Sequence, residues 1–161
     1  MVLTGRIPTK GVWAMTQDTA LLGQLDAEAQ QANPSSAFVA IGGAAAVSAV
    51  VDEFYTRLLA DPATTEFFTP LVESDGLSAL KRHQVLMLTK VLGGPDRYTG
   101  RDLQAAHAHL AITDETHRRV SLYLLTVMHD FKVPMDILQA ADGILRSVRP
   151  QVVTRPQEDA R

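Results

Sequence analysis

The chain contains no cysteine. This absence excludes a disulfide framework, a thiolate metal site, a cysteine nucleophile and covalent attachment of a cofactor through thioethers. Long apolar runs are also lacking, since none approaches the roughly 20 residues that are needed to span a bilayer. The stretch "GVWAM" after Lys10 is too short for the core of a secretory signal. We therefore expect a cytoplasmic location and no transmembrane segment.

An excess of positive charge is missing too. Fifteen lysine and arginine residues stand against 18 aspartate and glutamate residues, which gives a formal net charge of −3. The arginines are scattered, so the sequence offers no basic face for a nucleic-acid backbone, and we expect no nucleic-acid partner. The 161 residues are 46% hydrophobic and 20% charged, which is typical of one globular domain.

The composition divides the chain into three parts. Residues 1–35 mix Gly, Pro, Gln and Ser around a weakly helical stretch, "TALLGQLDAEAQ". We expect this N-terminal extension to be partly disordered or a short helix, and a tether, an appended helix and an over-called start site all remain open. Residues 36–154 form the expected domain. Residues 155–161 are polar and are expected to be a flexible tail.

The apolar spacing between the two ends predicts helices. The first helix is expected to end near Asp61, which can act as a cap, and Pro62 can open a short next turn. The second helix is expected to start after Ser74 and Asp75 and to end at "GGPDRYTG". The inward residues of the first are Val47, Val50, Val51, Phe54, Tyr55, Leu58 and Leu59. Those of the second are Leu77, Leu80, Gln84, Met87, Leu88 and Val91.

Three more helices are expected towards the C-terminus. Residues 101–109 predict a short one, Thr113 or Asp114 caps the next, and Pro134 suits the first position of the last. No strand or internal repeat is evident, so the predicted class is all-α. The inward residues of the last two helices are Val120, Leu124, Val127, Met128, Phe131, Leu138, Ala141, Leu145 and Val148.

The stretch "RDLQAAHAHL" carries two histidines two residues apart. In a strand they would share a face, but in a helix they point about 200° apart, so one ion cannot bind both. Leu103 and His107 align at i and i+4, which makes His107 the inward residue. A lone inward histidine is more often a structural residue than a metal ligand.

Other polar residues also interrupt apolar stripes. His83 and Gln84 lie beside Leu80 and Met87, and Tyr55 lies on the first stripe. Singly, each has an ordinary explanation: Tyr55 bonds a backbone carbonyl, Gln84 a loop, and His83 water. Together they would suit an apolar slot for a planar cofactor with a central iron, because imidazole is a common axial haem ligand and distal polarity decides what binds opposite.

These residues sit in motifs that resemble group I truncated haemoglobins. The matching stretches are "FVAIGG", "VVDEFYTRLLADP", "EFF", "LKRHQ", "LGGPDRYTGRDLQAAH" and "ITDE", in the family's order and spacing over about residues 38–154. The resemblance implies a truncated globin fold, a two-over-two helical sandwich around non-covalently held haem b (protohaem IX).

The resemblance also implies roles for individual residues. His107 matches the proximal iron ligand, and Tyr55 and Gln84 match the distal hydrogen-bond donors to a bound ligand. Preorganised donors of this kind hold a ligand that gains negative charge. The further cofactor-binding residues expected are Phe54, Phe68, Leu80, His83, Met87, Leu88, Tyr98 and Leu103. Arg97 and Arg101 are expected near the haem propionates or in a solvated turn.

His83 occupies a variable position of that family, where it can bind iron as a sixth ligand or lie in solvent and bridge a propionate. We favour coordination. His109, His117 and His129 are expected in solvent. The last expected helix lacks a histidine, so the covalent haem attachment of some family members is not expected.

Three functions are compatible with these residues. The first is binding of dioxygen, nitric oxide and carbon monoxide, with oxygen transport or oxidation of nitric oxide to nitrate; as a nitric oxide dioxygenase it would need an external reductase. The second is a redox or ligand sensor, or an electron-transfer protein, with bis-histidyl iron. The third is a helical interaction domain without cofactor. We expect a monomer or weak dimer.

Overall fold

The computed structural model describes residues 11–99 and 102–155, with side chains from residue 19 onward, and these residues contain helices but no strand. Its helices are α1 (Gly11–Ala32), α2 (Ala37–Ala40), α3 (Gly43–Ala60), α4 (Pro62–Thr65), α5 (Thr69–Glu73), α6 (Leu77–Val91), α7 (Leu103–His107), α8 (Asp114–Asp130) and α9 (Met135–Val152). Within the part of the chain that the structure describes, no helix is long and apolar enough to cross a membrane.

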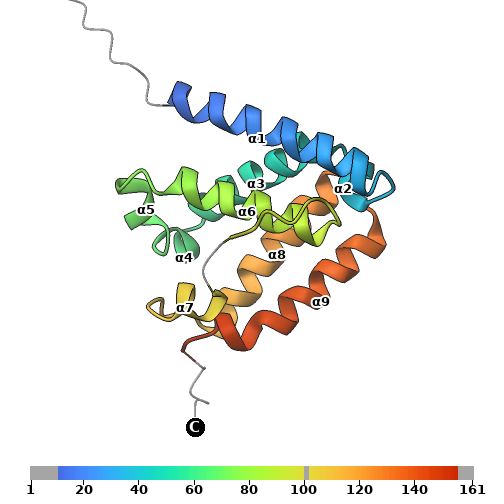
Figure 1. Ribbon diagram of the computed structural model, residues 1–161. Coiled ribbons are helices and arrows are strands. Elements are labelled where there is room, and N and C mark those ends of the chain that lie inside the picture. The colour runs from blue at the N-terminus through green and yellow to red at the C-terminus, as the bar shows by residue number, and fades with distance from the viewer. Residues whose placement is uncertain (1–10, 100–101, 156–161) are drawn as a thin grey trace, which may run out of the picture.

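Two helix pairs build the core. α3 packs on α6, α8 packs on α9, and α3 crosses α8 to join the pairs (Figure 1). This arrangement is the two-over-two sandwich that the resemblance to group I truncated haemoglobins implies. Val47, Val51 and Leu58 of α3 are almost wholly buried. They share one hydrophobic core with Val127 and Met128 of α8, which are buried as well. The apolar spacing of α3 and α8 therefore does place their stripes in one core.

Short polar caps set the helix boundaries largely as predicted. Asp61 accepts a hydrogen bond from the Ala63 N–H at 2.9 Å and begins α4, and Thr113 accepts one from the Thr116 N–H at 3.1 Å and begins α8. Pro134 is the residue before α9 rather than its first residue. The predicted start of α6 is confirmed, since the helix begins at Leu77, but Ser74 and Asp75 do not cap it: its N-cap is Gly76, Ser74 ends α5, and Asp75 has a left-handed backbone (φ 58°) in the turn between the two helices.

The inward stripes also need corrections. Phe131, predicted inside, is 41% exposed because α8 ends at Asp130, so Phe131 no longer follows the helical stripe. Val91, predicted inside, is 36% exposed at the end of α6. The face of α6 that is buried against the core carries Val85, Leu86, Leu88 and Thr89, and Leu92 continues it.

The two Gly-Gly elements of the sequence each serve a close approach. Gly43 has φ +71°, and a Cβ there would collide with the Asp26 carboxylate, which accepts the Ala44 N–H at 2.8 Å. Gly94 lies against Phe38, where a Cβ would come within 2.9 Å of the ring. Both elements thus let segments pack more tightly than a larger residue permits.

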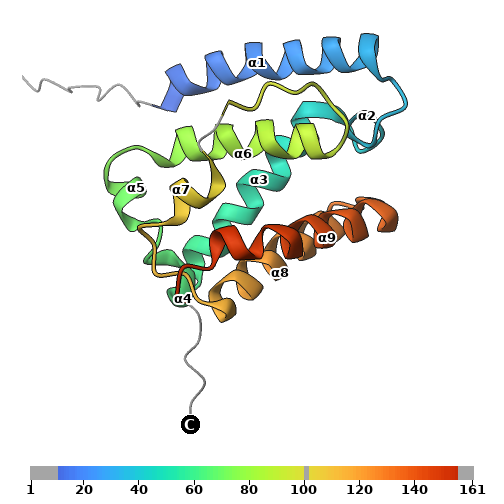
Figure 2. The same ribbon diagram turned by 60° about the horizontal axis from the view of Figure 1, so that its bottom comes forward.

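The N-terminal extension contains one long helix. α1 extends beyond the stretch 19–30 at both ends and lies along the outer side of α6, as Figure 2 shows. Leu25 and Ala29 are buried in the core, and the Asp26 carboxylate accepts the Ala44 N–H in the first turn of α3. In the described residues, α1 is therefore an appended helix that packs on the domain.

Candidate functional site

The proximal side of the site is built on α7. Asp102 caps this helix by accepting the Ala105 N–H at 3.1 Å. His107 is half-buried at its C-terminal end, and its Nδ1 lies 2.7 Å from the Leu103 carbonyl oxygen. Since a carbonyl can only accept, Nδ1 carries the hydrogen and Nε2 keeps its lone pair for a metal. His109 is exposed in the turn after α7, because the helix ends at His107 and does not reach residue 109 as predicted.

The segment after α7 is held by the end of α9. The Ile112 N–H donates to the Thr154 hydroxyl at 3.1 Å, and that hydroxyl in turn donates to the Leu110 carbonyl. The backbone N–H of Thr154 also donates to the Ile112 carbonyl at 3.0 Å. These bonds hold the segment after α7 on the end of α9, and α7 itself, with His107, packs on α9 (Figure 2).

Aromatic rings cluster on α3 and at Phe68, which follows α4. Tyr55 is 3% exposed, and burial raises the pKa of its phenol. Its ring meets Phe54 at 5.2 Å and Phe68 at 5.6 Å between centroids, in edge-on geometry. Among the described residues we find no hydrogen-bond partner for the Tyr55 hydroxyl. A buried phenol normally has one, so this hydroxyl is available to a ligand.

The predicted slot face of α6 is only half-covered by protein. Leu80, Gln84 and Met87 are half-buried, whereas Leu88 on the neighbouring face is 6% exposed. The three half-buried residues follow one another at i, i+4 and i+7, so they share one side of the helix. Leu103 of α7 is likewise half-buried.

His83 lies at the edge of α6 and is exposed. Its ring meets that of half-buried Tyr98 edge-on, with centroids 6.5 Å apart. The neighbouring residue Arg97 is bonded to α1: it donates to Glu28 Oε2 at 3.1 Å and to Gln24 Oε1 at 3.0 Å. Arg97 is therefore held by α1, and its place near a haem propionate stays a prediction. Arg101 lies outside the described residues.

Two further histidines differ from each other. His129 is exposed, as predicted. His117, predicted in solvent, is half-buried between α8 and α9, and its Nε2 is buried without a partner among the described atoms. Burial lowers the pKa of His117, and the positive charge of Arg149 lowers it further. The sequence did not indicate this, because the neighbours that cover His117 come from α9.

The two helix pairs, with a half-buried histidine on the short helix α7 and a buried tyrosine on α3, are the architecture of a truncated, two-over-two globin. The model of the "Bacterial-like globin" family matches residues 36–152, and the chain belongs to this family. Its cofactor is accordingly haem, and its ligands are small diatomic molecules.

Individual relatives agree with this assignment. The group 1 truncated haemoglobin GlbN of Mycolicibacterium paratuberculosis is 31% identical over 78% of this chain and 89% of its own length. GlbN of Synechocystis sp. is 32% identical over 65% of this chain and 84% of its own. The crystal structure of the Synechococcus sp. 2/2 haemoglobin, in the cyanomet state with covalently attached haem, superposes with a TM-score of 0.65 at 31% identity. That match covers 75% of this chain and 100% of the other.

Proposed function

We propose that His107 is the proximal iron ligand and that Tyr55 and Gln84 hold the bound diatomic ligand for reaction with nitric oxide. The hydrogen bond from His107 Nδ1 to the Leu103 carbonyl carries this proposal. A metal-binding histidine almost always donates its other ring N–H to an acceptor, which fixes the ring's direction and tautomer. The donor set therefore fits a haem iron, which when bound supplies reversible ligand binding and exchange of one electron.

The distal residues suit a ligand that gains negative charge. A phenol with the ordinary pKa of 10.0 is protonated at physiological pH, and burial raises the pKa of Tyr55 further, so its hydroxyl remains a donor. Gln84 brings an amide to the half-buried side of α6. The apolar residues Leu80, Met87 and Leu103 are half-buried by the protein alone, and a flat haem between α6 and α7 would cover them.

Oxidation of nitric oxide is the proposed reaction. One dioxygen, one nitric oxide and one electron would give one nitrate; a ferrous haem held by His107 would supply that electron, and a reductase would have to return it. Rapid mixing of the oxygenated ferrous protein with nitric oxide tests this. We expect ferric protein and one equivalent of nitrate at a rate that rises with nitric oxide concentration. Oxidation without nitrate would leave diatomic binding as the function and remove the dioxygenase.

A sensor is the second proposal, and one chain of contacts favours it. His83 meets Tyr98, Tyr98 follows Arg97, and Arg97 is bonded to Glu28 of α1. If His83 binds iron when no external ligand is present, its release would change α6, the connection to α7 and the docking of α1 together. External ligands would then bind only in the fraction of molecules with His83 released.

His83→Leu tests the coordination that this sensor needs. We expect the wild-type ferrous protein to have a six-coordinate low-spin absorption spectrum, and the variant to become high-spin and to bind carbon monoxide without the slow phase set by His83 release. His109→Leu, which changes an exposed histidine beside His107, is the matched control and should leave the spectrum unchanged. A high-spin wild-type spectrum at neutral pH would rule out coordination by His83.

A further inference from the structure

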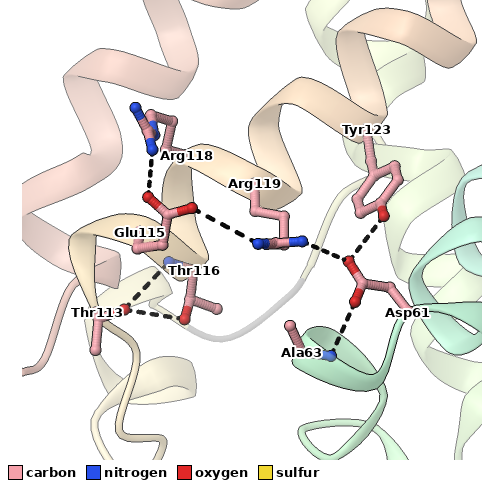
Figure 3. Close-up of polar contacts among 8 residues, drawn as sticks. All are labelled: Asp61, Ala63, Thr113, Glu115, Thr116, Arg118, Arg119 and Tyr123. Carbon is pink, nitrogen blue, oxygen red and sulfur yellow. Dashed lines mark hydrogen bonds and ion pairs between the residues drawn. The ribbon is translucent and has the colours of Figure 1, made fainter.

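One carboxylate, that of Asp61, ties the junction between α3 and α4 to α8. Asp61 Oδ2 accepts the Tyr123 hydroxyl at 2.8 Å and the Arg119 Nη1 at 3.1 Å, while its Oδ1 accepts the Ala63 N–H (Figure 3). The Asp61 side chain is 12% exposed. Arg119 also lies 3.8 Å from Glu115, one turn earlier on α8 (Figure 3). We call Asp61, Arg119 and Tyr123 the junction cluster.

The charges in the junction cluster are mutually supportive. A carboxylate is unfavourable at the C-terminal end of α3 but favourable at the N-terminal end of α4, and Arg119 offsets the first of these effects. The Ala63 N–H first, and then the Tyr123 hydroxyl, lower the pKa of Asp61. The hydrogen bond to Asp61 in turn raises the pKa of Tyr123. Asp61 is therefore ionised and Tyr123 protonated around neutral pH.

The junction also connects Tyr55 and Phe68, whose rings are in contact; we call these two residues the distal wall. Tyr55 lies on the last turns of α3, six residues before Asp61, and Phe68 follows α4, seven residues after it. Between them, fully buried Thr64 donates to the Leu58 carbonyl at 2.6 Å and so folds α4 back on α3. The ring of Phe68 then rests against that of Tyr55. A shift of the junction would change the angle between these two rings.

We propose that the junction cluster is a positioning group for the distal wall: by holding the α3–α4 junction on α8, it keeps Phe68 against Tyr55 and fixes the direction of the Tyr55 hydroxyl. This inference rests on the proposed role of Tyr55 as donor to the bound ligand. The cluster acts through Tyr55 and touches neither ligand nor haem. Its effect is on the strength with which the ligand is held.

Tyr123→Phe in the haem-loaded protein is the test, because it removes one hydroxyl and leaves Asp61 its bonds to Arg119 and Ala63. We expect the dioxygen dissociation rate to rise about fivefold, the scale of one weakened hydrogen bond. The C–O stretching band of the carbon monoxide complex should shift or split, since it reports the direction of the distal donor. Asp61→Asn should change both readouts in the same direction.

The matched control is Asp130→Asn. It removes the ion pair from Arg57 to Asp130 (2.8 Å), which also joins α3 to α8 but does not reach α4. We expect the wild-type band and dissociation rate in this variant. Unchanged values in Tyr123→Phe, or equal changes in Asp130→Asn, would show that the cluster stabilises the fold only.

A double variant separates this inference from the proposed function. If the cluster acts through Tyr55, then Tyr123→Phe has no further effect on dioxygen release in a Tyr55→Phe background. An additive effect there would overturn the positioning role while leaving Tyr55 as the donor. If Tyr55→Phe alone changes nothing, the proposed function itself fails.

Discussion

Replacing His107 by alanine is expected to speed haem loss by more than about 100-fold, since even the loss of a group that only orients a metal ligand costs roughly 10- to 100-fold in metal affinity. The measurement is transfer of haem from the ferric protein to an excess of a haem scavenger. It should be made in a His83→Leu background, so that the second histidine does not replace the first. Added imidazole should restore the absorption spectrum of the His83→Leu protein, because it supplies the missing proximal ligand.

His109→Ala is the control for this prediction. His109 is exposed and lies two residues from His107, so any effect of altering the end of α7 appears here too. We expect its rate of haem loss to match that of the wild-type protein. Equal loss in both variants, or a His107→Ala protein with an unchanged spectrum of the carbon monoxide complex, would show that iron is held elsewhere.

Helix content could be predicted from local signals, whereas the two-over-two arrangement was implied by the resemblance to group I truncated haemoglobins. The spacing of apolar residues in α3, α8 and α9, the Asp61 and Thr113 caps and Pro134 all act within a few residues, and the structure has these helices. The spacing of apolar residues in α6 predicted its buried face only in part. Its predicted stripe contains Leu80, Gln84 and Met87, which the protein only half-buries, while Val85 and Thr89 face the core.

The junction cluster and the docking of α1 could not be predicted in the same way. The Asp61 partner Tyr123 is 62 residues away, and the Arg97 partner Glu28 is 69 residues away. Each of these residues is ordinary in its own segment: an aspartate before proline, a tyrosine on an amphipathic helix, an arginine in a turn. Only the crossing of α3 over α8, and of α1 over the turn after α6, gives them a partner.

Tyr55→Phe is expected to raise the dioxygen dissociation rate by about 10- to 100-fold, the cost of removing a hydrogen bond to a ligand that carries charge. The ring and its contacts with Phe54 and Phe68 remain, so packing should change little. Carbon monoxide gains less charge when bound, and its dissociation should change by less than dioxygen's. Stopped-flow displacement of each ligand measures both rates. Equal changes for the two ligands would indicate altered access to the haem rather than a lost donor.

The pH dependence gives the same residue a second test. Burial raises the pKa of Tyr55 above its ordinary value of 10.0, so the hydroxyl still donates where an exposed phenol has ionised. Dioxygen release should therefore stay constant from pH 7 through 10 in the wild-type protein.

Unfolding behaves differently, because the unfolded chain loses the Tyr55 proton at a lower pH than the folded protein does. The contribution of Tyr55 to the free energy of unfolding is complete below pH 10 and declines as the pH rises towards the folded pKa. Chemical denaturation of the haem-loaded protein should show a smaller alkaline decline in Tyr55→Phe than in the wild type, and an identical decline would mean that the phenol is already ionised or exposed in the folded state.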